Sequence, residues 1–482
     1  MKGRIKVLVS CLIISRLFLM TVYAMPDWPA DTGIQAEAGI VIDADSGAVL
    51  FGQNIHAAYP PASITKILTA LIVLENSRLD DMVTFSKDSV YNVEEGSGNK
   101  LNVTDGDRLS VEDCLYSLIL HSCNQAANAL AEHVAGSREE FVRMMNDKLE
   151  ELGCKESHFD NPSGLNGDTQ YVTAYDMALI AREAYDNEKL VEISSALSHD
   201  IPPTANNPEG LTIYNEHRLV KTKDTGSEFY FPAAIAGKTG YLIKAGNTLV
   251  TYAEQDGRRL ISVILKGSPK QYFLDGKALL EFGFDRFENL PVTGNETGYG
   301  TGEETVEIDG TSYPSSDLEL ELEPDRVITL PKGAEFSQAV RTLVTDLPAG
   351  SPEGAVALIQ YTYNDRKVGE VYLTAKGDAV PASQESEDGT AGTESGETKE
   401  AEDVNKTEAP EKKGIGLPAA AGIAVFLGLL AAGTGFAVYR KKKEAREIAL
   451  RREERRRRLK AEGDEEAFQR MMKERRKSKG KK

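Results

Sequence analysis

Residues 247–267 read "NTLVTYAEQDGRRLISVILKG", two apolar runs joined by Asp256-Gly257. Such runs are typical of strands, and an Asp-Gly pair between them favours a two-residue hairpin turn. Residues 36–54, "AEAGIVIDADSGAVLFGQN", repeat the pattern around Asp45-Ser46-Gly47. Helical patterns lie between these hairpins, including residues 64–74 and 111–134. Strands at both ends with helices between them predict one α+β domain with an antiparallel sheet.

The chain after this domain changes character twice. Residues 291–376 contain short alternating runs separated by turn residues, which predict a small all-β domain. This segment has no cluster of acids, bases or metal ligands, so we interpret it as a spacer or interaction module. Residues 377–413 are rich in Glu, Ser, Thr and Gly and poor in large apolar residues. They cannot bury enough apolar surface to fold, and we expect a disordered acidic linker.

Both ends of the chain predict a membrane address. Residues 1–24 combine early basic residues, an apolar run and the ending Val22-Tyr23-Ala24, which is typical of a signal peptide. Because Arg16 interrupts the apolar run, an uncleaved N-terminal anchor is the alternative. Residues 414–439 are long and apolar enough to cross a bilayer as a single transmembrane helix. The basic residues that follow place residues 440–482 in the cytoplasm, and everything between the two segments on the extracytoplasmic side of the cell membrane.

Charge is divided unevenly between these parts. The chain carries a formal net charge of -19, but residues 440–482 contain 20 Lys and Arg against 9 Asp and Glu, a net charge of +11. The remaining residues therefore carry -30, which argues against nucleic acid as a partner. We expect the basic tail to lie near anionic lipid headgroups.

"PPASITKILTAL", residues 60–71, places Ser63 and Lys66 nearly one helical turn apart at the start of an apolar helix. A serine hydroxyl is a poor nucleophile unless a neighbouring base takes its proton, and a neutral lysine can be that base. A second nearby cation would disfavour protonation of Lys66, so the pattern predicts another lysine in the site. Ser97 and Lys100 form a second S-x-x-K, but in a polar stretch without apolar periodicity. We expect Ser97 to be mobile and solvated.

Two further motifs carry polar groups suited to the same chemistry. Ser122-Cys123-Asn124 interrupts a helical pattern that Ser110 and Asp113 begin as a capping box. Its hydroxyl and amide can relay a proton and hold a substrate amide, although a polar helix break is the structural alternative. Lys238-Thr239-Gly240 offers an exposed cation and hydroxyl beside an apolar strand, with glycines that let an extended peptide approach. Lys238 supplies the second lysine.

The order S-x-x-K, S-x-N, K-T-G is the signature of penicillin-binding enzymes. With "NPSGLN" at 161–166, "TAYDMALIA" at 173–181 and "AGKTGY" at 236–241, residues 32–288 resemble the serine-type D-alanyl-D-alanine carboxypeptidases, the low-molecular-weight penicillin-binding proteins of peptidase family S11. The resemblance implies a β-lactamase/transpeptidase-like catalytic domain. It also implies peptidoglycan stem pentapeptides as substrates and β-lactams as covalent inhibitors. The following β domain resembles the C-terminal domain of that family.

The resemblance also implies roles for individual residues. The catalytic residues would be Ser63 as nucleophile, Lys66 as general base and Ser122 as proton shuttle. The substrate-binding residues would be Asn124 for the peptide amide, Lys238, Thr239 and Gly240 for the terminal carboxylate, Tyr241 with Ser63 for the oxyanion through their backbone N–H groups, and Arg218 as a further carboxylate ligand.

The chain departs from the family in two places. Relatives commonly carry a His-Tyr pair where this chain has Gln170-Tyr171, so we assign that loop no catalytic role. Many relatives attach to the membrane through a short amphipathic helix, whereas this chain is predicted to span the bilayer.

Cofactor and metal chemistry find no support in the sequence. Once Cys11 leaves with the signal peptide, Cys114, Cys123 and Cys154 allow at most one disulfide and show no metal-ligand spacing. No H-E-x-x-H pattern is present. We therefore expect neither a cofactor nor a metal.

Two other functions remain open. A β-lactamase would share the three motifs but needs a group that activates water against the acyl-enzyme, and none is identified here. A β-lactam or muropeptide receptor would acylate slowly and signal through the basic tail.

Overall fold

The computed structural model describes residues 25–93, 97–299, 305–308, 311–314, 319–348 and 350–376. The predicted signal peptide, acidic linker, membrane span (414–439) and basic tail all lie outside these residues. Within the described part of the chain, no helix is long and apolar enough to cross a membrane.

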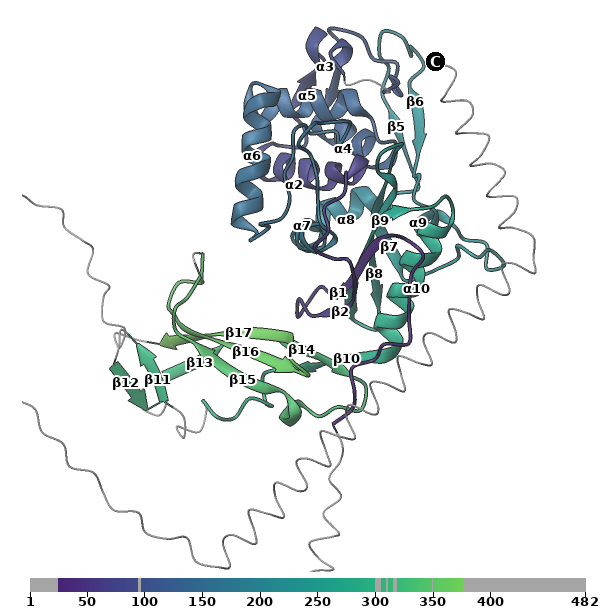
Figure 1. The fold of residues 1–482 in the computed structure, drawn as a ribbon. Coiled ribbons are helices and arrows are strands. Elements are labelled where there is room, and N and C mark those ends of the chain that lie inside the picture. The colour runs from purple at the N-terminus through teal and green to yellow at the C-terminus, as the bar shows by residue number, and fades with distance from the viewer. Residues whose placement is uncertain are drawn as a thin grey trace, which may run out of the picture. The chain divides into compact units, whose positions relative to one another are not determined.

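A five-stranded antiparallel sheet forms the centre of the α+β region (Figure 1). Its spatial order is β2 (Val49–Gln53), β1 (Ala38–Asp43), β9 (Arg258–Gly267), β8 (Gly246–Gln255) and β7 (Ala234–Leu242). Both predicted hairpins are present, and β1 pairs with β9 from Ala38↔Leu265 to Asp43↔Leu260. Asp256 and Gly257 have φ angles of 52° and 76°, as a tight hairpin turn requires. The sheet therefore joins the two ends of the domain.

Helices cover both faces of this sheet (Figure 1). Ile40 and Ile42 of β1 belong to one buried core together with residues of α2, α4, α5 and α7, whereas Val41 belongs to a second core with α10. Alternate residues of one strand thus serve two cores, as the two-residue period of a strand dictates. The helical elements are η1 (Ala62–Thr65), α2 (Lys66–Asn76), α3 (Lys87–Tyr91), α4 (Val111–Leu120), α5 (Asn124–Ala135), α6 (Arg138–Glu151), α7 (Ala174–Asp186), α8 (Glu188–Ser195), α9 (Arg218–Lys221) and α10 (Gln271–Arg286).

Short strand pairs complete this region. They are β3 (Met82–Thr84) with β4 (Arg108–Ser110) and β5 (Ser198–Ile201) with β6 (Leu211–Tyr214). β4 leads directly into α4, where Ser110 and Asp113 form the predicted capping box. The helical pattern predicted over 111–134 is not continuous, because α4 ends at Leu120 and α5 begins at Asn124.

The described residues of 287–376 form antiparallel strands and one short 3-10 helix, η3 (Phe336–Gln338). The first strand continues directly from α10, before the predicted boundary at 291. The strands are β10 (Phe287–Pro291), β11 (Thr305–Ile308), β12 (Thr311–Pro314), β13 (Glu319–Leu322), β14 (Val327–Pro331), β15 (Val340–Val344), β16 (Ala355–Tyr363) and β17 (Arg366–Lys376). β13, β17, β16 and β15 form a four-stranded sheet, while β10 pairs with β14 and β11 with β12.

Trp28 packs where the five-stranded sheet meets these strands. Its indole N–H donates to the carbonyl of Leu50 in β2 (3.0 Å), and its ring lies 4.9 Å from that of Phe287 and 6.5 Å from that of Tyr363. The Tyr363 hydroxyl in turn donates to the carbonyl of Pro26 (2.7 Å). Residues 26–28 therefore contact strands from both regions.

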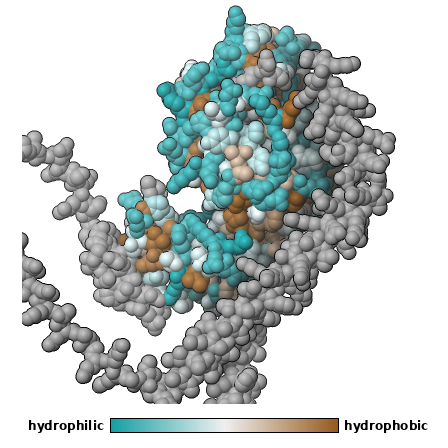
Figure 2. All heavy atoms as spheres, viewed as in Figure 1, coloured by the Kyte–Doolittle hydropathy of each residue, from teal (hydrophilic) through white to brown (hydrophobic). Residues whose placement is uncertain are grey.

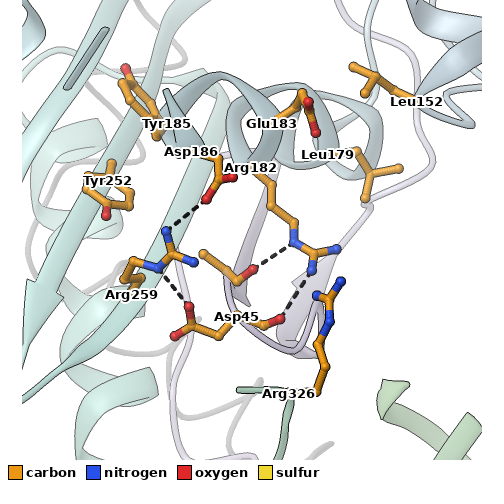
Figure 3. A pocket seen from close by; sticks show the side chains of 11 residues that line it. Asp45, Leu152, Leu179, Arg182, Glu183, Tyr185, Asp186, Tyr252, Arg259 and Arg326 are labelled. Atoms are coloured by element: carbon orange, nitrogen blue, oxygen red, sulfur yellow. Dashed lines mark hydrogen bonds and ion pairs between the residues drawn. The ribbon is translucent and has the colours of Figure 1, made fainter. Parts of the chain in front are cut away.

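A polar pocket lies beside the β1–β2 turn (Figure 3). Arg259 of β9 pairs with Asp45 (2.7 Å) and Asp186 (3.0 Å), while Arg182 of α7 donates to the backbone carbonyls of Ala44 and Asp45 (Figure 3). These interactions hold the turn against α7 and β9. None of the predicted site residues lines this pocket. Hydrophilic residues cover most of the molecular face over the helices (Figure 2).

Candidate active site

Ser63 and Lys66 lie in contact at the start of α2. The structure differs from the sequence expectation in one detail, because Ser63 lies in the 3-10 turn η1 and the α-helix begins at Lys66. The Lys66 side-chain nitrogen Nζ donates to Ser63 Oγ at 3.0 Å, and Lys66 is fully buried. The spacing that the sequence singled out thus places a base within hydrogen-bond reach of a hydroxyl.

Further contacts fix the position of Lys66 Nζ. Nζ also donates to Asn124 Oδ1 (2.7 Å) and to the backbone carbonyl of Ser163. Asn161 supports this carbonyl, since its side-chain oxygen accepts from the backbone N–H groups of Ser163 (3.2 Å) and Gly164 (2.8 Å). Sequence reasoning missed the Ser163 contact, because every residue has a backbone carbonyl and the sequence does not show which one accepts a hydrogen bond. The motif "NPSGLN" at 161–166 marked the segment but not this contact.

Ser122 and Asn124 lie in the break between α4 and α5. Ser122 is buried and has φ of +56°, a left-handed conformation that is uncommon for a residue other than glycine. Cys123 caps α5 by accepting from the Ala126 N–H (3.4 Å), and its own N–H donates to the Ser117 carbonyl (3.0 Å). The S-x-N motif is therefore a helix break, and this break also delivers Asn124 to Lys66.

Lys238 lies in β7 and is only 1% exposed, so the prediction of an exposed cation there is wrong. Its Nζ donates to the carbonyl of Thr239 (3.1 Å). Burial lowers the pKa of Lys238 to about 8, while the carboxylate of Glu216 raises that pKa and the ammonium of Lys100 lowers it. Lys238 is thus a poorly solvated cation that a carboxylate ligand would stabilise.

The glycines of the K-T-G segment serve close packing within the protein. A Cβ on Gly240 would lie 2.8 Å from the backbone nitrogen of Ser63, and Thr248 of β8 donates to the carbonyl of Pro61 (2.9 Å). A Cβ on Gly237 would lie 2.6 Å from the His217 ring. β7 therefore packs directly against η1, and Tyr241 follows Gly240 on the same strand. The Tyr241 residue itself is exposed.

Two other residues from the sequence analysis lie as follows. The Arg218 guanidinium stacks over the Phe229 ring at 3.8 Å, at the start of α9. Among the described contacts, none joins Arg218 to Ser63, Lys238 or Thr239. Gln170 is buried and donates to the carbonyl of Leu165 (2.8 Å), so it supports the loop that carries Ser163.

The second S-x-x-K lies in a largely exposed stretch, as expected, but its Ser97 is half-buried and both Ser97 and Lys100 make hydrogen bonds. Ser97 Oγ accepts from Asn124 Nδ2 (2.8 Å), and Lys100 Nζ donates to the backbone carbonyl of His121 (2.8 Å) and to Glu216 (2.8 Å). Periodicity could not reveal this, because the residues act through single contacts from a loop.

The assembled groups suit acyl transfer. The Ser63 hydroxyl contacts the buried Lys66, Gly240 of β7 packs against the Ser63 backbone nitrogen, and a second buried lysine, Lys238, lies on β7. Within the part of the chain that the structure describes, no group of three or more His, Cys, Asp or Glu is placed to hold a metal ion. The three cysteines that it describes are all buried and free.

Several known proteins are similar to this chain in sequence and fold. The model of D-alanyl-D-alanine carboxypeptidase peptidase family S11 matches residues 25–268. The chain is 31% identical over 262 residues to the D-alanyl-D-alanine carboxypeptidase DacF of Bacillus subtilis, covering 54% of this chain and 64% of that protein. It is 34% identical over 266 residues to DacB2 of Mycobacterium tuberculosis, covering 54% and 84%. Penicillin binding protein 5 from Haemophilus influenzae superposes with a TM-score of 0.57 at 26% identity, covering 72% of this chain and 98% of that structure. The chain therefore belongs to the S11 family of serine-type D-alanyl-D-alanine carboxypeptidases and has their penicillin-binding α+β fold.

Proposed function

We propose that this enzyme removes the terminal D-alanine from peptidoglycan stem pentapeptides through an acyl-enzyme at Ser63, and that β-lactams acylate the same hydroxyl. The observation that carries the proposal is the 3.0 Å contact between Lys66 Nζ and Ser63 Oγ inside a buried site. Family membership supports the reaction class.

In this proposal, acylation proceeds as follows. Ser63 Oγ attacks the carbonyl carbon of the penultimate D-alanine while its proton passes to Lys66, which acts as a neutral base. The backbone N–H groups of Ser63 and Tyr241 donate to the developing oxyanion. The C–N bond then breaks, and the departing D-alanine nitrogen receives a proton by way of Ser122. Water cleaves the resulting ester and regenerates the Ser63 hydroxyl.

Substrate binding uses the opposite charge on β7. Lys238, protonated below a pKa of about 8, receives the terminal carboxylate together with Thr239, and Asn124 holds the peptide amide. The substrate carboxylate would stabilise the Lys238 ammonium in place of the water that burial excludes. Arg218 stays a weaker carboxylate ligand in this proposal, because its guanidinium lies over Phe229.

The proposal includes a membrane location. Residues 1–24 would direct export, residues 414–439 would anchor the enzyme as a single-pass protein, and the basic residues 440–482 would stay in the cytoplasm. The support is the length and composition of these segments. Protease treatment of intact cells tests it, since the catalytic region should be digested while an epitope at residue 482 should be protected.

The activity test follows free D-alanine and protein mass during incubation with diacetyl-Lys-D-Ala-D-Ala. Wild-type protein should release D-alanine, and Ser63→Ala should release none and gain no mass from benzylpenicillin. If wild type is acylated by penicillin but releases no D-alanine, the carboxypeptidase proposal fails and the result supports a β-lactam or muropeptide receptor instead.

A further inference from the structure

Residues 97–102 contact both walls of the candidate active site. One wall carries the break between α4 and α5, and the other carries the segment before α9 together with β7. Lys100 Nζ donates to the carbonyl of His121 on the first wall and pairs with Glu216 on the second, both at 2.8 Å. His121 immediately precedes Ser122. One side chain thus joins the S-x-N break to the sheet side of the site.

Glu216 is fixed to the sheet side by its neighbours. The Asn215 side chain accepts from the His217 backbone N–H (2.8 Å), and the buried His217 ring lies 3.1 Å from Thr251 Oγ1 in β8. The same ring would collide with any side chain at Gly237, next to Lys238. The carboxylate that Lys100 contacts therefore belongs to the structure that positions Lys238.

The same segment contacts the catalytic lysine through a short chain of hydrogen bonds. Ser97 Oγ accepts from Asn124 Nδ2 (2.8 Å), while Asn124 Oδ1 accepts from Lys66 Nζ (2.7 Å). Because a carboxamide oxygen and nitrogen lie on one plane, the bond to Ser97 sets the orientation that Asn124 presents to Lys66.

We propose that Lys100 is a positioning residue for the proposed acyl-transfer reaction, on which this inference rests. By bridging His121 and Glu216 it holds residues 97–102 across the site, so that Ser97 orients Asn124 and the two walls keep their spacing around the substrate. Lys100 and Glu216 also act as an opposed pair of charges on Lys238. Neither residue exchanges protons or bonds with the substrate.

The charges predict a signature that a merely structural role would not give. The carboxylate of Glu216 raises the pKa of Lys238 and the ammonium of Lys100 lowers it. The charge of Lys238 lowers the pKa of both His121 and His217. Removing the Lys100 ammonium should raise the pKa of Lys238, so activity should persist to higher pH. Removing the Glu216 carboxylate should lower that pKa, so that, as the pH is raised, activity should begin to fall at a lower pH than in wild type. A change in stability alone would not shift the two profiles in opposite directions.

The test uses the full chain in detergent and two readouts, kcat/KM for D-alanine release against pH and the rate of Ser63 acylation by benzylpenicillin. We expect Lys100→Met to lower both rates roughly tenfold, as a misplacement of a fraction of an ångström can do. Lys100→Arg should recover most of the loss. Lys148→Met is the matched control, because Lys148 of α6 pairs with Glu75 of α2 and with Glu151, and its rates should stay within about twofold of wild type.

Three results would overturn the inference. The first is that Lys100→Met has the same rates as Lys148→Met, and the second is that the upper pH limits of activity in Lys100→Met and Glu216→Gln do not shift in opposite directions. The third is that a variant carrying both Lys100→Met and Glu216→Gln recovers the full rate of acylation. If Lys100→Met fails to fold, the limits of Glu216→Gln and the acylation rate of Ser97→Ala carry the test, and wild-type values for both would also refute it. If wild type acylates without releasing D-alanine, the proposed function fails while the acylation rates still decide this inference.

Discussion

Replacing Lys238 by methionine should abolish activity yet stabilise the folded protein near neutral pH. The pKa of Lys238 falls from its usual 10.5 to about 8 because the ammonium is buried. At about 1.4 kcal/mol per pH unit, holding the buried lysine protonated costs the folded state about 3 kcal/mol. Methionine keeps most of the volume and removes this cost. It also loses the hydrogen bond to the Thr239 carbonyl, worth about 1 kcal/mol.

The net expected gain at pH 7 is about 2 kcal/mol in the free energy of unfolding, or roughly 4–8 °C in Tm for a domain of this size. The sign depends on pH. Below pH 8 both folded and unfolded wild type keep the proton, so the full cost is present. Between pH 8 and 10.5 only the unfolded state keeps it, so wild-type stability rises and the advantage of Lys238→Met disappears.

Thermal unfolding at pH 7 and pH 10, with benzylpenicillin acylation measured in parallel, checks this prediction. Lys148→Met serves as a control, since its lysine is paired with Glu75 and Glu151 near the surface. The reasoning is refuted if Lys238→Met unfolds at a lower temperature than wild type at pH 7. It is also refuted if the gain in Tm is the same at both pH values.

Three further substitutions test the packing around the site. Gly240→Ala would place a Cβ 2.8 Å from the Ser63 nitrogen, so penicillin acylation should fall roughly 100-fold, and an unchanged rate would contradict the packing of β7 on η1. Gly164→Ala meets both a φ of +79° and the Ala62 carbonyl carbon at 2.6 Å, and chemical denaturation should show a loss of about 2 kcal/mol or more. Ser110→Ala removes the cap of α4 and should cost about 1 kcal/mol while D-alanine release stays at the wild-type rate.

Local patterns were sufficient to predict the strands and the capped start of α4. Alternation located the strands of both hairpins, and their outer positions in the domain suggested a shared sheet. The exact register of β1 on β9 could not follow from sequence, since pairing across so long a separation depends on the complete set of cores. The end of α4 at Leu120 was anticipated only as the alternative interpretation of the S-x-N motif, because the apolar and alanine-rich runs on either side both favour helix.

The site was predictable wherever side-chain chemistry was written into a motif. Ser63 and Asn124 both contact Lys66 Nζ, and each belongs to a motif of recognisable spacing. Lys238 was predicted as an exposed cation beside an apolar strand, whereas it is buried within β7, because two flanking glycines do not reveal what packs on a strand. Ser97 and Lys100 were dismissed for lack of periodicity, although a loop residue needs only one well-placed partner to belong to a site.

Trp28 has a practical consequence for spectroscopy, because it is the only tryptophan in the chain. Its ring lies against those of Phe287 and Tyr363. Intrinsic emission excited at the red edge of protein absorption will therefore monitor the seam between the catalytic sheet and the later strands. A change in the Trp28 spectrum during penicillin binding would mean that binding alters the packing at this contact. A loss of the native emission on heating would give the temperature at which the two regions separate.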